Sequence, residues 1–235
     1  MKALLFDYGG TLDTAACHWS YVIEKGYQEA GICLNETDFR TAYVYGERTL
    51  ARNCIVLPQD GFKQLMLKKV DIEFSDLEAH NVLQFKTKEN RNVAIEKVAS
   101  YCDKFARQHV LEAESILKEL SHRYKLIMVS NFYGNLRTIL DEYGISGFFE
   151  DIVESSVVGV RKPDPAIWAL GIKAAQCQPQ EAIAIGDSFS KDILPAKTLG
   201  CNTIWFKGKE WEEKSYDETV PAHIITKLED LLKIL

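Results

Sequence analysis

The spacing of apolar and polar residues divides the chain into two kinds of segment. From about residue 111 onward, short runs rich in β-branched residues alternate with stretches of helical periodicity. The predicted strands are KLIMVS at 125–130, DIVESSVV at 151–158, AIAIGD at 182–187 and NTIWF at 202–206, and the predicted helices are 113–124, 135–144, 164–176 and 191–200. This alternation is typical of a parallel sheet with helices on both faces. The opening run ALLFD at 3–7 is assigned to the same sheet, because a lone strand needs partners.

Between residues 15 and 110 the pattern is almost entirely helical. Apolar residues recur at helical spacing in 19–31, 36–53, 61–71 and 91–108. We therefore predict an α/β protein with two parts: a Rossmann-like core of 1–14 and 111–235, and an inserted all-helical cap of 15–110. An insertion directly after the first strand lies over the carboxyl ends of the strands, where open α/β sheets bind their ligands.

Composition narrows the function classes. The 235 residues are 46% hydrophobic and 26% charged, with a formal net charge of −6 and a pI near 5.5. Nucleic acid is not expected as a partner, because polyanion binding relies on clustered Lys and Arg. The six cysteines form no C-x-x-C pair, the first apolar run is too short for a signal peptide, and no run reaches about 18 apolar residues. We expect a cytoplasmic protein that does not bind membranes; the sequence makes no prediction of its oligomeric state.

The first candidate for chemistry is Asp7, which follows the opening apolar run and precedes two glycines. Small residues at that point let a substrate approach the backbone closely. A carboxylate can attack phosphorus and form an acyl phosphate that water later hydrolyses. Taken alone, an Asp in a glycine-containing loop is as often a plain turn residue.

Polar residues also follow two later apolar runs. Ser130 and Asn131 end KLIMV and can donate hydrogen bonds to a phosphoryl oxygen, although both residue types are common helix caps. Lys162 lies in RKPDP, where the prolines restrict the backbone. A lysine held in this way can neutralise the charge of a carboxylate nucleophile and of the group being transferred.

Asp187 and Asp192 form the most specific single motif. Asp187 ends the run AIAIGD, and Asp192 lies five residues later at the start of a predicted helix. Paired carboxylates of this kind suit Mg²⁺, which takes one or two carboxylates together with substrate oxygens and waters. Asp192 can instead complement the helix dipole or bond to Lys162, which leaves Asp187 as the direct ligand.

In this order and spacing, D-x-x-x-T, S-N, K-P-D-P and G-D-S-x-x-x-D resemble the haloacid dehalogenase-like hydrolase superfamily, and the insertion matches its helical cap. The resemblance implies that Asp7 is the nucleophile and a magnesium ligand, with Gly9 adding its backbone carbonyl. It implies that Thr11 and Ser130 bind phosphate, that Lys162 balances charge, and that Asp187 completes the metal site with Asp192 in support. Asp13 matches a frequent acidic position for which a structural or hinge role is expected.

The chain departs from the phosphatases of that family at Gly9, where they usually carry the Asp that protonates the leaving group. We expect a magnesium-dependent hydrolase of a small phosphorylated metabolite with weakened acid and base catalysis. Two alternatives stay open. One is a family member of the phosphonatase or dehalogenase type, for which activity on phosphonoacetaldehyde is one test. The other is a catalytically silent protein that binds a phosphorylated ligand or a protein partner.

Residues of the cap give weaker signals. His18 is a candidate substitute acid, although a lone His is more often a packing residue. Arg48 and Arg52, four apart, can recognise an anion but are more often a solvated helix face. The aromatic residues Trp19, Tyr21, Tyr43 and Tyr45 are interpreted as cap core, and nothing in the sequence singles out Lys25, Lys63 or Lys68 for Schiff-base chemistry.

Overall fold

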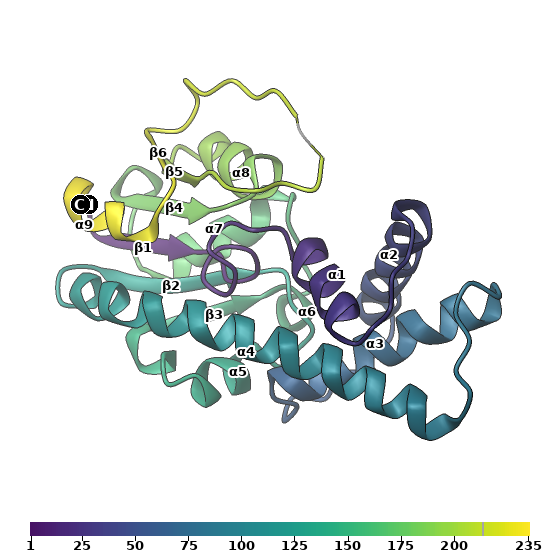
Figure 1. Ribbon diagram of the computed structural model, residues 1–235. Coiled ribbons are helices and arrows are strands. Elements are labelled where there is room, and N and C mark those ends of the chain that lie inside the picture. The colour runs from purple at the N-terminus through teal and green to yellow at the C-terminus, as the bar shows by residue number, and fades with distance from the viewer. Residues whose placement is uncertain (213) are drawn as a thin grey trace.

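The computed structural model describes residues 1–212 and 214–235. Within them the strands form one six-stranded, fully parallel sheet in the order β3-β2-β1-β4-β5-β6 (Figure 1). The strands are β1 (Ala3–Phe6), β2 (Lys125–Ser130), β3 (Asp151–Glu154), β4 (Ala182–Gly186), β5 (Asn202–Phe206) and β6 (His223–Ile225). The predicted parallel sheet is confirmed, and β6 is an additional strand that the sequence pattern did not reveal.

Side-chain alternation along the strands separates two apolar layers. On β1, Leu4 and Phe6 pack against the apolar residues of α4 (Lys88–Ser121) and α5 (Leu136–Glu142). Ala3 and Leu5 belong to the layer formed with α7 (Pro165–Ala174) and α8 (Leu194–Thr198). A strand covered on both faces is apolar throughout, which explains why ALLF shows no polar position. The expected arrangement of helices on both faces is therefore confirmed.

The segment after β1 is helical and lies beyond the carboxyl ends of the strands (Figure 1). It contains α1 (Trp19–Glu29), α2 (Glu36–Arg52), α3 (Phe62–Ala79) and the first part of α4. Helix α4 joins two helices that the pattern placed separately, because no Gly or Pro interrupts Lys88–Ser121. The proposed division into core and cap at 110/111 thus falls inside one continuous helix, and the division itself stays a prediction.

The remaining elements are short. They are the helices α6 (Ser155–Val158) and α9 (Leu231–Ile234), the 3₁₀ turns η1 (Ser146–Phe148), η2 (Pro179–Glu181) and η4 (Leu228–Asp230), and the π-turn η3 (Phe189–Ile193). The run 151–158, predicted as one strand, is β3 followed directly by α6, which ends at Gly159 in the left-handed conformation. None of the helices described is long and apolar enough to cross a membrane.

Candidate active site

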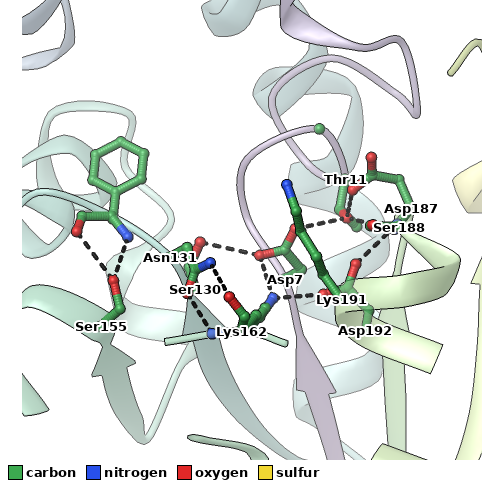
Figure 2. A network of polar contacts seen from close by, with 12 residues as sticks. Asp7, Thr11, Ser130, Asn131, Ser155, Lys162, Asp187, Ser188, Lys191 and Asp192 are labelled. Carbon is green, nitrogen blue, oxygen red and sulfur yellow. Dashed lines mark hydrogen bonds and ion pairs between the residues drawn. The ribbon is translucent and has the colours of Figure 1, made fainter. Parts of the chain in front are cut away.

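The sheet topology brings three of the sequence motifs to one edge. Strand β1 lies between β2 and β4, and Phe6 is in register with Met128 on one side and Ile185 on the other. Because all three strands are parallel, their carboxyl ends meet at the same edge of the sheet. Asp7, Ser130 and Asp187 therefore come together although they lie far apart in the sequence (Figure 2).

Asp7 lies at the centre of a buried polar network (Figure 2). Its Oδ1 accepts a hydrogen bond of 3.0 Å from Ser130 Oγ and one of 2.6 Å from Lys162 Nζ. The hydroxyl of Thr11 is 3.4 Å from its Oδ2. One carboxylate oxygen is thus held by two donors, while the other is more weakly engaged.

Lys162 joins Asp7 to Asp192. Its ammonium group is buried and donates to Asp192 Oδ1 at 2.7 Å, in addition to Asp7. Burial acts to lower the pKa of Lys162, but the charges of Asp192 and Asp7 outweigh it and raise the pKa above its ordinary value. The other oxygen of Asp192 accepts from Ser188 N at 2.9 Å, so both oxygens of this carboxylate have donors.

Asn131 fixes the backbone of Lys162. The amide group of Asn131 donates to the carbonyl oxygen of Lys162 at 3.1 Å and accepts from its N–H at 2.8 Å. A side-chain amide that makes both bonds to one residue determines where that residue's side chain begins. The predicted contact of Asn131 with substrate stays a prediction; in the structure Asn131 orients Lys162, a role that the motif S-N alone did not indicate.

Three carboxylates, from Asp7, Asp187 and Asp192, present oxygen atoms within 4.8 Å of one another. Among residues 1–212 and 214–235, Lys162 is the one ammonium bonded to this group, so with all three carboxylates ionised the net charge is −2. Burial, and then repulsion from Asp192 and Asp7, raise the pKa of Asp187 well above its ordinary value. A divalent cation would offset the charge excess and the repulsion of Asp187 by Asp192 and Asp7, so the donor set fits Mg²⁺.

Thr11 holds Asp187 in place. Its hydroxyl donates to Asp187 Oδ1 at 2.9 Å and accepts from the backbone N–H of Asp187 at 3.1 Å. These bonds tie the loop after β1 to the end of β4. The predicted contact of Thr11 with phosphate stays a prediction, and the contact described is with Asp187.

Asp13 is fully buried beneath the β1 loop. It accepts a hydrogen bond from Gly10 N at 2.7 Å and one from Trp19 Nε1 at 3.0 Å. Burial raises the pKa of Asp13 to about 8, against the effect of these two donors. The side chain thus connects the β1 loop to the first residue of α1, a geometry that agrees with the structural role the family resemblance implies.

A cavity of about 1010 Å³ opens over this network. Asp7, Gly9, Ser130, Asn131, Lys162, Asp187 and Asp192 line it from the core. The wall formed by α2 and α3 includes Tyr43, Glu47 and Lys69, none of which the sequence analysis assigned to a site. Glu47 bonds to Lys69 and accepts from Tyr133 Oη at 2.8 Å. The sequence around Lys69 is that of an ordinary helix, so nothing in it indicates that this lysine lines a cavity.

The weaker candidates of the cap separate in the structure. Arg52 lines the cavity, whereas Arg48 does not. Lys25, Lys63 and Lys68 lie outside it and pair with Glu29, Glu96 and Asp60, respectively.

His18 serves as the N-cap of α1, accepting from Ser20 N, and its ring stacks on Trp211. Burial and then the charge of Lys191 lower the pKa of His18 to about 4, so its imidazole is neutral at pH 7 and is a poor source of a proton.

The comparisons with known proteins agree with this geometry. The family model described as haloacid dehalogenase-like hydrolase matches residues 1–200. A glyceraldehyde 3-phosphate phosphatase of Pyrococcus abyssi is 38% identical over 120 residues, which are 51% of this chain and 50% of the relative. The chain thus spans about half the length of the curated relatives it matches.

Solved structures show the same fold. A HAD-hydrolase of Bacillus subtilis, described as bound to magnesium, superposes with a TM-score of 0.60 at 21% identity, covering 100% of this chain and 98% of that one. A 2-haloacid dehalogenase of Pseudomonas syringae gives 0.56 at 19% identity, with 100% and 97% covered. The fold is therefore shared with proteins described as a HAD-hydrolase and as a 2-haloacid dehalogenase. Together with the match of the family model over most of the chain, the motifs at the strand ends establish that the chain belongs to the haloacid dehalogenase-like hydrolases.

Proposed function

We propose that the protein is a magnesium-dependent phosphomonoester hydrolase in which Asp7 accepts the phosphoryl group. The observation that carries the proposal is the contact of Asp7 with Lys162 and Ser130 on the floor of a large cavity, beside two further carboxylates. A dehalogenase has no use for a metal ion, whereas a phosphatase of this family needs one, and these carboxylates suit it. The matched relatives named as phosphatases support the same choice.

Each residue has a role that its contacts allow. Asp7 Oδ1 is held by Ser130 and Lys162, so Oδ2 is the oxygen free to attack phosphorus. Lys162 offsets the negative charge of the nucleophile and of the phosphoryl oxygens that approach it. Asn131 keeps Lys162 in this position, and Thr11 does the same for Asp187.

Asp187, Asp7 and the backbone carbonyl of Gly9 would hold the metal ion. Both oxygens of Asp192 already have donors, so we assign Asp192 to the support of Lys162 and of the site's charge. When bound, Mg²⁺ supplies positive charge that stabilises the transferring phosphoryl group.

Gly9 affects the second half of the reaction most. General acid and base catalysis increases the reaction rate on the order of 10²- to 10⁴-fold, and a glycine cannot provide it. A substrate with a good leaving group needs little acid, so Asp7 is phosphorylated faster than water clears the acyl phosphate. We expect a burst of product followed by slow turnover; equal first and later turnovers would count against this order of rates.

The substrate class we propose is a small phosphorylated metabolite. Arg52 and Arg161 line the cavity in addition to the catalytic lysine, and this charge suits an anion. Relatives named as glyceraldehyde 3-phosphate phosphatases make a three-carbon phosphate the first compound to test.

The decisive experiment measures phosphate release from an aryl phosphate with and without Mg²⁺, for the parent and for Asp7→Asn, on protein freed of contaminating phosphatases. We expect magnesium-dependent release that Asp7→Asn abolishes, together with a phosphorylated Asp7 in the intact protein by mass spectrometry. A parent that is inert even in its first turnover would overturn the proposal. Binding of inorganic phosphate without turnover would then favour a silent binding protein, and release from phosphonoacetaldehyde would favour a phosphonatase.

A further inference from the structure

Lys191 is a further lysine that lines the cavity, and no motif of the sequence analysis assigned it a role. It lies in η3, immediately before Asp192, and its side chain is exposed to the cavity that also contains Asp7. Its backbone carbonyl accepts from Trp168 Nε1 at 3.1 Å, which fixes the point where the side chain begins. Figure 2 shows the side chain extending past the Asp7 carboxylate, away from strand β1.

Lys191 and Lys162 differ in their partners. Lys162 is buried and committed to Asp7 and Asp192. The ammonium group of Lys191 forms no ion pair or hydrogen bond within residues 1–212 and 214–235. Its charge acts instead on two groups of the inserted helical segment. After burial, it is the next cause that lowers the pKa of His18. Burial raises the pKa of Glu47, but Lys69, Tyr133 and then Lys191 lower it. Lys191 therefore faces the cap side of the cavity.

The cap side is where a leaving group must depart. In phosphoryl transfer the attacking and leaving oxygens lie roughly in line on opposite sides of phosphorus. Asp7 attacks from the floor formed by the strand ends, so the leaving oxygen points toward the cap. At position 9 there is no side chain, and a Cβ placed there would meet nothing within 4 Å. The space beside the leaving oxygen is thus open to a flexible side chain from another element.

We infer that Lys191 binds the leaving-group oxygen of the substrate and stabilises its developing negative charge, in place of the acid that Gly9 cannot provide. The inference rests on the proposed function. As the bond between Asp7 and phosphorus forms, the bond from phosphorus to the leaving oxygen breaks and its electron pair stays on that oxygen. The ammonium group of Lys191 holds this charge through a charge-assisted hydrogen bond and keeps its own proton. The released oxyanion then takes a proton from water, leaving hydroxide.

The test compares leaving groups in the first turnover. Each protein is mixed, in excess over the ester, with 4-nitrophenyl phosphate or phenyl phosphate. The variants are Lys191→Gln and Lys191→Arg. Lys197→Gln is the control, because Lys197 is an exposed lysine on α8 outside the cavity. We expect Lys191→Gln to slow Asp7 phosphorylation about 100-fold with phenyl phosphate, the range for loss of one transition-state donor. With the nitrophenyl ester, which needs little help to depart, the loss is about threefold or less. Lys191→Arg retains most of the rate with both, and Lys197→Gln resembles the parent.

The outcomes separate this inference from the proposed function. A parent without Asp7-dependent phosphate release overturns the proposed function and the inference with it. A parent that turns over, with Lys191→Gln unchanged on both esters, overturns the inference alone. Equal losses of rate on both esters would also overturn the inference. They would place Lys191 at the transferred phosphoryl group or at the metal site. Thermal unfolding of each variant, with and without Mg²⁺, checks that the fold and the cation response are retained.

Discussion

A Cβ atom on Gly10 would lie 2.6 Å from Oδ2 of Asp187, closer than real Cβ atoms approach other atoms. Gly10 also has a φ of 94°, in the region that residues with a side chain rarely adopt. The loop after β1 therefore passes directly against the carboxylate at the end of β4. Position 9, one residue earlier, has open space around it and no such backbone requirement.

This contrast predicts opposite outcomes for two neighbouring substitutions. Gly10→Ala should lower the free energy of unfolding by about 1–3 kcal/mol, the usual cost of a strained backbone residue, and should displace Asp187 and abolish activity. Gly9→Ala should change the unfolding free energy by less than about 1 kcal/mol. Urea denaturation and phosphate release measure both. Equal effects of the two substitutions would contradict the described loop.

Gly9→Asp should restore the acid and base that the family's phosphatases carry. The open space at Gly9 accepts a side chain without a clash, so we expect slow turnover to rise by about 100-fold, the lower end of the range for such a group. The matched control is Gly9→Asn, which has the same size and no ionisable proton. Steady-state release of phosphate decides the matter, and an Asn variant as fast as the Asp variant would refute this explanation.

Asp187→Asn should have two effects of opposite sign. Without metal, it removes an ionisable group whose burial beside two other carboxylates is unfavourable, so the unfolding free energy should rise. With Mg²⁺, the parent should gain about 2.7 kcal/mol at 100 times the dissociation constant, and the variant should gain little.

Thermal and urea unfolding at matched ionic strength measure both effects, with the exposed Asp141→Asn as control. A variant that keeps the full magnesium response would show that the cation binds elsewhere.

Glu73, inside the cap, should make stability depend on pH. It is fully buried, its Oε2 accepts from Tyr27 Oη at 2.7 Å, and its Oε1 has no hydrogen-bond partner in the part of the chain described. Burial raises the pKa of Glu73 from 4.5 to about 7, although Lys69 opposes the shift and Glu47 adds to it. The folded state therefore binds the proton more tightly than the unfolded state does.

The stabilisation by protonated Glu73 is complete below pH 4.5 and is lost as the pH rises to about 7. The shift of about 2.5 units corresponds to a loss of about 3 kcal/mol. Glu73→Gln should lack this loss, while the exposed control Glu114→Gln should keep it. Urea unfolding between pH 5 and pH 8 compares the three proteins, and parallel curves for the parent and Glu73→Gln would show that Glu73 is ionised throughout.

Much of the fold follows from the sequence pattern, with specific exceptions. Apolar runs precede Asp7, Ser130 and Asp187, and each run is a strand in the structure. An unbroken apolar run predicts such a strand, because a strand buried on both faces has no polar position. Two features could not be predicted from the sequence pattern: the continuity of α4 and the short strand β6. Two periodic segments with no Gly or Pro between them can form one helix or two, and a three-residue strand is too short to show a period.

The sequence by itself determined which groups meet at the floor of the site. Parallel strands end at one edge, so motifs that follow successive strands converge whatever the details of packing. Only the tertiary structure decided how these groups are connected and what faces them.

Three features depend on how loops and helices from distant parts of the chain pack together: the clamp of Asn131 on Lys162, the wall formed by Glu47 and Lys69, and the difference between Lys162 and Lys191. A lysine's chemistry is set by the charges that surround its ammonium group, and those charges come from residues that the sequence places far away.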